Sequence, residues 1–185
     1  INDGELAKVV AAGEPARTYY AKDTSKVPMF AEALDKNCLA PKVLTLCVGA
    51  RVMLLKNIDP FNGLANGSLG TVIEMHNKEV HVEFDNGTSC ALSTETWDFF
   101  QGEESVAQRE QIPLRLAWAV TIHKSQGKTY ERVAIDLGRG AFEHGQTYVA
   151  LSRCTSLNGV FLKKPLTPRD IMVDERVAEF YETMR

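Results

Sequence analysis

The chain has 185 residues, of which 44% are hydrophobic and 24% charged, and its formal net charge is −3. This size suffices for one substantial hydrophobic core or two small ones. No apolar run is long enough to span a membrane, and the N-terminus lacks a signal-peptide pattern, so we expect an intracellular protein with no membrane partner. The four cysteines are irregularly spaced and predict neither a disulfide framework nor a zinc site, so no metal ligands are assigned.

Charge is distributed unevenly along the chain. Residues 113–169 contain nine Lys or Arg and three Asp or Glu, whereas residues 1–112 contain ten and sixteen. A basic segment within an acidic protein is typical of a face that binds a polyanion. Ordinary variation of a solvated surface is the alternative.

The first 40 residues predict a short helix, a strand and a connector. Leu6, Val9 and Val10 share one face of a short helix that we expect to end at Gly13. Residues 17–21 are rich in β-formers and predict a strand, and residues 28–39 are typical of a connector with one or two helical turns. Because the sequence begins without Met, we expect it to be a segment of a longer chain.

Short strands separated by glycine turns follow from residue 43. The Asn-Gly pairs at residues 66–67 and 86–87 favour hairpins, because both residue types tolerate a positive φ angle. The clearest strands are expected at residues 52–55, 71–75 and 80–84. Together these features predict a small antiparallel barrel of the SH3-like kind, with an irregular β-meander on a larger sheet as the alternative.

The pattern becomes α/β after an acidic loop at residues 101–104. Expected strands lie at residues 114–120, 133–137 and 160–162, and expected helices at residues 146–154 and 173–184. Strands that alternate with helices imply a parallel sheet.

The stretch around which the chain is organised is residues 112–127, IPLRLAWAVTIHKSQG. Its apolar part is typical of a buried strand, and ligands of open α/β sheets bind at the carboxyl ends of such strands. We therefore expect phosphate oxygens to meet the polar residues that follow, which are Thr121, His123, Lys124, Ser125 and Gln126. A solvated loop after a core strand is the alternative.

Residues 126–129, QGKT, end like a Walker A loop, but the position that should be its first glycine is Ile122. A β-branched residue cannot supply that turn. The chain contains no other Gly-Lys pair, so it lacks the parts needed to hold and hydrolyse a nucleotide alone.

Several motifs in the same order resemble those of the Pif/RecD-like superfamily-one DNA helicases, and the petite-integration-frequency branch fits best. Residues 116–127, LAWAVTIHKSQG, are similar to motif V of that family, and residues 145–153, GQTYVALSR, to motif VI. Residues 48–57 and 66–70 resemble the segment that leads into the family's inserted small barrel. The similarity runs from about residue 40 to the C-terminus.

The resemblance implies an α/β fold, namely a RecA-like parallel-sheet domain that lacks the P-loop and is interrupted by an SH3-like antiparallel barrel. Residues 1–48 and 113–185 would form the second RecA-like motor domain, incomplete at its N-terminus, and residues 49–112 the inserted barrel. In this family ATP and Mg²⁺ are held mainly by the first RecA-like domain, which is absent here.

The resemblance also assigns roles to individual residues. Arg153 is expected to be the catalytic arginine finger, which stabilises charge on the transferred phosphoryl group. Gln126, the Gly127 amide and Gln146 are expected near the γ-phosphate of ATP. The residues expected on single-stranded DNA are Thr121, His123, Lys124, Ser125, Lys56, Asn57 and Asn66. For His123 a structural role is the alternative, and for Lys56, Asn57 and Asn66 a role in turns.

The function implied by the resemblance is that of the C-terminal motor half of an ATP-dependent 5′-to-3′ DNA helicase, an ATP hydrolase with roles in DNA repair and recombination. The expected partners are single-stranded DNA and the N-terminal RecA-like domain of the same chain, and a monomer is expected. Such a protein would lie in the bacterial cytoplasm or nucleoid, or in the nucleus or mitochondrion. The segment by itself is expected to be inactive.

Two other functions remain open. The chain could be a non-catalytic nucleic-acid-binding module in which the small barrel binds. It could also be a degenerate P-loop phosphotransferase, which would need Lys128 to contact a nucleotide.

Overall fold

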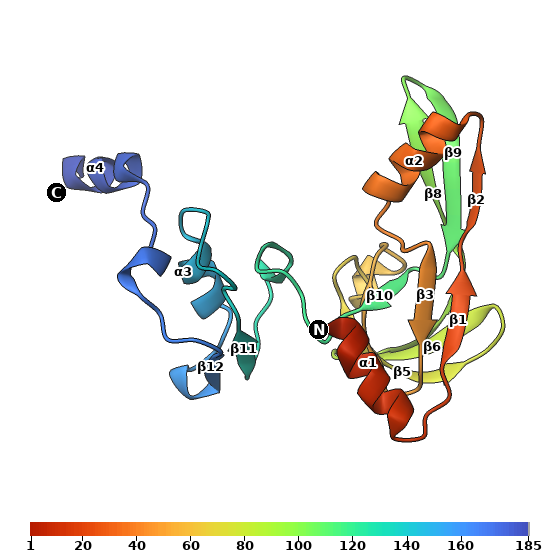
Figure 1. The fold of residues 1–185 in the computed structure, drawn as a ribbon, viewed down its shortest axis with the longest axis horizontal. Coiled ribbons are helices and arrows are strands. Elements are labelled where there is room, and N and C mark those ends of the chain that lie inside the picture. The colour runs from red at the N-terminus through yellow and green to blue at the C-terminus, as the bar shows by residue number, and fades with distance from the viewer. Residues whose placement is uncertain (185) are drawn as a thin grey trace. The chain divides into compact units, whose positions relative to one another are not determined.

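The structure, a computed structural model, describes residues 1–184 with the exception of the Ala178 side chain. The chain divides into two compact units, Ile1–Ala119 and Val120–Arg185. Each unit has its own secondary structure (Figure 1) and its own buried residues.

The first unit is predominantly β. Its elements are α1 (Asn2–Ala11), β1 (Arg17–Tyr20), β2 (Lys22–Ser25), α2 (Pro28–Asn37), β3 (Val43–Leu46), β4 (Arg51–Leu54), the 3₁₀ turn η1 (Pro60–Asn62), β5 (Leu69–Met75), β6 (Glu79–Phe84), β7 (Ser89–Ser93), β8 (Glu95–Gln101), β9 (Glu104–Gln111) and β10 (Leu114–Leu116). The strands form a five-stranded sheet in the order β10-β4-β5-β6-β7, a three-stranded sheet β2-β9-β8 and a pair β1-β3, all antiparallel.

The core of this unit lies on one face of the five-stranded sheet. In β6, Val80, Val82 and Phe84 are buried while His81 and Glu83 are not, as the two-residue period of a half-buried strand requires. Helix α1 places Leu6 in this core, and Val9 and Val10 pack against it, which confirms the helix expected there. Each fully buried aliphatic side chain contributes about 1.5–3 kcal/mol to the stability of the unit.

The five-stranded sheet is open rather than closed into a barrel. Among residues 1–184 its two end strands, β10 and β7, do not pair with each other. Strands β8 and β9, which lie within the expected barrel of residues 49–112, instead form a hairpin that pairs with β2 (Figure 1). The expected acidic loop at residues 101–104 is the turn of this hairpin, where Gly102 has a φ angle of +63°.

The strand expected at residues 114–120 is shorter than its apolar sequence predicts. It ends at Leu116, and it pairs antiparallel with β4 rather than with a parallel neighbour. The side chain of Asn2 explains the early end, because its Oδ1 accepts from Ala119 N at 2.7 Å and its Nδ2 donates to Ala119 O at 3.0 Å. These side-chain bonds satisfy backbone groups that would otherwise need a neighbouring strand.

Residues 28–39 also differ from expectation, because α2 is a full ten-residue helix rather than a connector. Pro28 occupies its first turn, where a missing N–H costs nothing. The Asp35 carboxylate of this helix accepts a hydrogen bond from Arg109 of β9. The sequence pattern of α2 does not reveal this contact.

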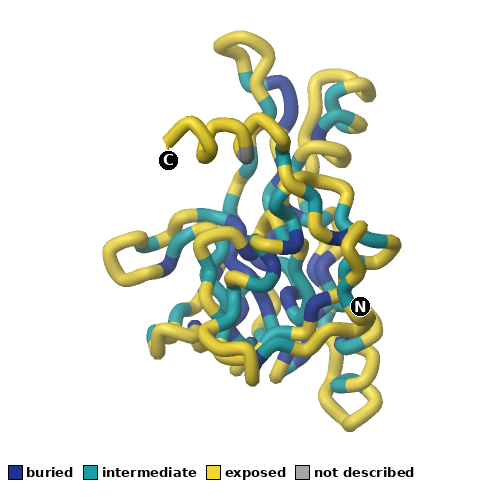
Figure 2. The backbone as a smooth tube through the Cα atoms, turned by 90° about the vertical axis from the view of Figure 1, so that its left-hand side faces the viewer, coloured by how far each residue is buried: buried dark blue, intermediate teal, exposed yellow. Residues whose placement is uncertain are grey.

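The second unit is smaller and has few buried hydrophobic residues among those described. Its elements are the 3₁₀ turn η2 (His123–Ser125), β11 (Val133–Ile135), α3 (Gln146–Leu151), η3 (Leu157–Gly159), β12 (Val160–Leu162), η4 (Pro168–Asp170) and α4 (Glu175–Thr183). Strands β11 and β12 are parallel, and among the described residues they are the only parallel strand pair in the named sheets. The buried hydrophobic residues described in this unit are Ile135 and Ala150, and α4 is exposed at each described position (Figure 2).

The fold is therefore α/β with mixed sheets, as expected in outline. None of the helices among residues 1–184 has the length and apolar character needed to cross a lipid bilayer.

Candidate functional site

The polar segment after Val120 folds into a single 3₁₀ turn, η2. Thr121 Oγ1 accepts from Lys124 N at 3.4 Å, so this hydroxyl begins the turn. His123 and Lys124 are exposed, whereas Ser125 is buried and its Oγ donates to Ile122 O at 2.6 Å. Thr121, His123 and Lys124 therefore present polar groups to solvent, and Ser125 directs its hydroxyl into the turn itself.

The backbone of this segment is not a phosphate cradle. The amides of Ser125, Gln126 and Lys128 donate to carbonyl oxygens of the turn, the last to Ser125 O at 3.0 Å. Ile122 lies in the right-handed helical region, and Gly127, with a φ angle of +74°, reverses the chain after the turn. A P-loop needs a ring of amides that point at the phosphates, so the geometry argues against the phosphotransferase alternative. Among the described backbone hydrogen bonds, the Gly127 amide donates to no carbonyl oxygen of this turn.

Arg153 follows α3, and its guanidinium lies against the backbone of its own unit. Nε donates to Val149 O at 3.0 Å, Nη1 to Lys128 O at 3.5 Å and Nη2 to the Ser152 hydroxyl at 2.8 Å. The residue is half-buried rather than enclosed in the hydrophobic interior. A guanidinium has five N–H groups, so these three contacts leave further donors for an anion.

Backbone hydrogen bonds bring Arg153 next to the segment that contains Gln126 and Gly127. Tyr130 N donates to Arg153 O at 2.8 Å, and Tyr130 forms a parallel bridge with Cys154. Together with the bond from Arg153 to Lys128 O, this pairing places three of the residues expected near ATP on two adjoining stretches of chain.

Gln146 lies at the start of α3, away from the Arg153 end of that helix. Its Oε1 accepts from Phe142 N at 2.9 Å, and Gly145, with a φ angle of +71°, precedes it as the N-cap. The side chain thus closes the loop before α3, which is the ordinary role of a polar side chain at a helix start.

The three expected DNA contacts of the first unit share one loop region. Lys56 Nζ contacts Glu95 Oε2 at 2.8 Å and Thr96 O at 2.9 Å, and it lies 5.4 Å from the centroid of the Trp97 ring. Asn57 Oδ1 accepts from Asn66 N at 2.8 Å, which joins the two ends of the loop. These hydrogen bonds give Lys56, Asn57 and Asn66 a structural role in the loop.

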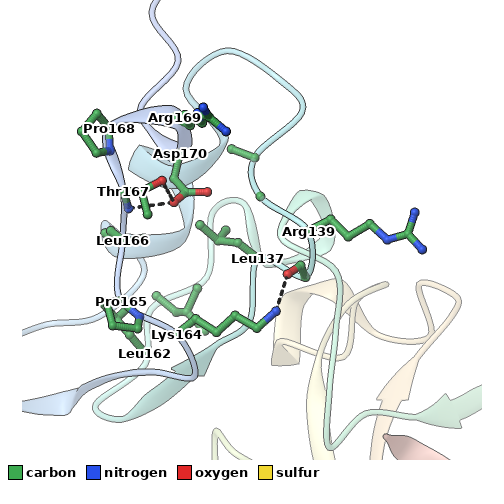
Figure 3. A pocket seen from close by; sticks show the side chains of 14 residues that line it. Leu137, Arg139, Leu162, Lys164, Pro165, Leu166, Thr167, Pro168, Arg169 and Asp170 are labelled. Carbon is green, nitrogen blue, oxygen red and sulfur yellow. Dashed lines mark hydrogen bonds between the residues drawn. The ribbon is translucent and has the colours of Figure 1, made fainter.

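A basic depression, not anticipated from the sequence, lies at the carboxyl ends of β11 and β12 (Figure 3). Its volume is about 640 Å³, and Arg139, Lys164 and Arg169 are the cationic residues that line it. Lys164 Nζ donates to Gly138 O at 3.0 Å. The sequence signals in the chain are Lys163-Lys164, directly after β12, and Arg139, four residues after the end of β11.

Carboxylates beside this depression are held ionised by their neighbours. The Lys163 ammonium, followed by the Gly138 amide, lowers the pKa of Asp136. The Thr167 amide and then its hydroxyl lower the pKa of Asp170, which closes a capping box at η4. The Lys163 ammonium balances the charge of Asp136, whereas the groups that bind Asp170 are neutral, so its negative charge offsets part of the positive charge of the depression.

The chain is similar in sequence to known proteins. The family model described as "DNA helicase Pif1, 2B domain" matches residues 29–75. The ATP-dependent DNA helicase PIF1 of Danio rerio is 40% identical over 172 residues, which cover 91% of this chain and 26% of the relative. The ATP-dependent DNA helicase Pif1 of Bdellovibrio bacteriovorus is 40% identical over 152 residues, which cover 82% and 34%. This chain therefore spans only about a quarter to a third of the length of these curated relatives.

Solved structures show the same likeness at the level of the fold. The crystal structure of Pif1 helicase from Candida albicans matches with a TM-score of 0.86 and 32% identity, covering 100% of this chain and 46% of that one. The Bacteroides Pif1 helicase in complex with ADP-AlF3 and ssDNA matches with a TM-score of 0.80 and 32% identity, covering 98% and 42%. By this likeness in sequence and structure, the chain belongs to the Pif1-like superfamily-one helicases.

Proposed function

We propose that this chain is the C-terminal motor half of an ATP-dependent 5′-to-3′ DNA helicase. The observation that carries the proposal is the pairing of the Arg153 stretch with the stretch that contains Gln126 and Gly127. Named relatives that are ATP-dependent DNA helicases, and a Bacteroides relative solved with ADP-AlF3 and ssDNA, support it.

In this proposal residues 1–48 and 113–185 belong to a second RecA-like domain, and residues 49–112 form an SH3-like insertion. The antiparallel strands β4 to β7 in the inserted segment and the parallel pair β11–β12 in the later segment support the division. The family model for the 2B domain overlaps the insertion.

Arg153 would act on a phosphoryl group held by another domain. Hydrolysis of ATP builds negative charge on the equatorial oxygens of the γ-phosphate, and a guanidinium supplied from across a cleft neutralises it. Gln126, Gly127 and Gln146 would line the same side. Because residues 121–128 form no amide cradle, the nucleotide and its Mg²⁺ would be held mainly by a first RecA-like domain.

The exposed polar groups of Thr121, His123 and Lys124 would bind the backbone of single-stranded DNA, with Ser125 holding the turn. A hydroxyl, an imidazole and an ammonium suit sequence-independent contacts to phosphates. Lys56, Asn57 and Asn66 would belong to a second, weaker stretch of the DNA path. The motor would act as an intracellular monomer.

The test is a chimaera in which this chain replaces the matched part of the Candida albicans Pif1 helicase. We expect the chimaera to hydrolyse ATP in a manner stimulated by single-stranded DNA, and we expect this chain by itself to hydrolyse none. A chimaera that binds ATP yet hydrolyses it no faster than the separate first domain would contradict the proposal. So would ATP hydrolysis by the isolated chain at a rate that depends on Arg153.

A further inference from the structure

Four potential metal ligands meet at the end of the β5–β6 hairpin, and none of them belongs to the proposed motor site. Glu74 lies directly opposite His81 in the antiparallel pairing, and His76 N donates to Glu79 O at 2.9 Å. Alternate residues of a strand share a face, and directly opposite residues of paired strands share it too. Glu74, His76, Glu79 and His81 therefore form a two-by-two array on one face of the hairpin.

A β-bulge in β5 places this array on the solvent side. Val72 pairs with Val82, but Glu74 pairs with His81, so Ile73 is one extra residue on β5. Val72 and Val82 are buried, and without the bulge Glu74 would continue their inward-facing set. The extra residue turns Glu74 outward and lets Met75 pack against the core instead.

The donor atoms are already close together. His76 Nε2 lies 3.2 Å from Glu74 Oε1, and His81 Nε2 lies 3.2 Å from Glu79 Oε1. The two imidazole rings meet edge to face with centroids 5.2 Å apart, and one ligand atom from each of Glu74, His76 and His81 lies within 4.8 Å of the others. Ligands around a tetrahedral zinc ion at about 2.1 Å are about 3.4 Å apart, so small side-chain rotations would close the set.

The backbone beneath the array is held in place. The Tyr19 hydroxyl, on a buried residue of β1, donates to His76 O at 2.8 Å. Arg17 Nη1 donates to Asn77 Oδ1 at 2.7 Å, which fixes the turn and leaves one cation beside the cluster. A site whose backbone is preorganised loses less conformational freedom when an ion binds.

We propose that Glu74, His76 and His81 bind a borderline divalent cation of the zinc class, with Glu79 the nearest carboxylate for a fourth position. Two imidazole nitrogens with a carboxylate oxygen are a ligand set typical of Zn²⁺, whereas Mg²⁺ prefers oxygen ligands in near-octahedral geometry. The bound ion would link β5 to β6 and fasten the hairpin end. Cysteine spacing gives no hint of this site, because the ligands come together only across the hairpin.

The experiment is a titration of the metal-free chain with ZnCl₂ against a competing chromophoric chelator. Three single variants accompany it: His76→Ala, His81→Ala and the matched control His144→Ala, which removes a histidine of the other unit. All three residues lie outside the buried core, and circular dichroism checks that each variant keeps the β-sheet signal. Parallel thermal melts are recorded with and without Zn²⁺, and with Mg²⁺ in its place.

We expect one equivalent of Zn²⁺ to bind and to raise the melting temperature. His76→Ala and His81→Ala should each lower the affinity at least tenfold, whereas His144→Ala should leave it unchanged. Zn²⁺ affinity that is the same in all three variants would overturn the assignment, as would Mg²⁺ binding at the same site with equal strength. Absence of stoichiometric binding to the wild-type chain would overturn it as well.

Discussion

The guanidinium of Arg109 binds both carboxylate oxygens of Asp23, with Nε to Oδ1 at 2.8 Å and Nη2 to Oδ2 at 2.7 Å. Arg109 is 2% exposed, and it also donates to Asp35 and, at 3.1 Å, to Ala40 O. One side chain of β9 thereby joins β2, α2 and the loop after α2. The Asp23 and Asp35 carboxylates raise the pKa of Arg109 further above its already high ordinary value, so it stays charged.

We predict that Asp23→Ala lowers the free energy of unfolding of the first unit by about 3 kcal/mol, because it leaves a buried charge short of its main partner. Asp85→Ala is the matched control. It breaks an Arg51–Asp85 pair that is also two-pronged, through Nη1 and Nη2, but Asp85 is 54% exposed, so about 1 kcal/mol or less is expected. Urea unfolding of the two variants measures the difference, and equal losses would show that burial does not decide the cost.

The acid sensitivity of the second unit should depend on Asp170. Its pKa is lowered in the folded chain, so the stability that its ionised form contributes is present above the unfolded value of about 3.9 and is lost as the pH falls through the folded pKa. We therefore expect Asp170→Asn to melt lower than the wild type at pH 6, with the gap closing below about pH 3.9. Thermal melts across this range, with the exposed Asp3→Asn as control, test it. A gap independent of pH would contradict the prediction.

Gly159 is predicted to be intolerant of any side chain. A Cβ atom there would lie 1.9 Å from Glu131 O and 2.7 Å from Cys154 Sγ, so the backbone beside β11 would have to move. We expect Gly159→Ala to destabilise the second unit by about 1–3 kcal/mol. Gly4→Ala is the control, since nothing lies within 4 Å of its Cβ position and alanine favours the helix α1. Chemical unfolding that ranks the two variants equally would rule out the close approach.

Binding of single-stranded DNA should depend more on Lys124 than on Lys56. Lys124 is exposed in η2 and belongs to the basic segment of residues 113–169, whereas the Lys56 side chain is 35% exposed and lies in the more acidic segment of residues 1–112. We expect Lys124→Ala to weaken binding of an oligothymidine and to reduce the slope of log affinity against log salt by about 0.7, the loss of one phosphate contact. Fluorescence anisotropy at several salt concentrations, with Lys36→Ala as the control, measures it. A larger loss in Lys56→Ala would favour the alternative in which the inserted segment does the binding.

Local sequence patterns predicted much of the fold because they report which face of an element is apolar. The alternation around Val82 located β6, and the positions of Leu6, Val9 and Val10 located α1. Patterns of this kind carry no information about distant partners. The Asn2 side chain ends β10 early from a position more than 110 residues away, and Arg109 needs Asp23 and Asp35 from two other elements.

The candidate functional site was likewise predictable only in part. The motif around Gly127 and the one ending at Arg153 were each recognisable as sequence, and the bonds through Lys128 and Tyr130 that join them could not be. The basic depression was missed because it combines the segment after β11 with the segment after β12. The histidine cluster was missed because the β-bulge at Ile73, which sets the pairing of Glu74 with His81, has no clear sequence signal. Ser125 was expected to face phosphate, but its hydroxyl is used by Ile122 O, a choice that depends on the turn geometry.

The most direct measurement is the rate of ATP hydrolysis by the Pif1 chimaera with Arg153→Ala, at saturating ATP and single-stranded DNA. We predict that kcat falls by about 10³–10⁵-fold while affinity for ATP changes little, because the guanidinium acts on charge that develops during hydrolysis. Arg176→Ala, whose guanidinium contacts only Asp174 among the bonds described, is the control and should keep full activity. An Arg153→Ala chimaera that hydrolyses ATP within tenfold of the unmodified chimaera would contradict the account.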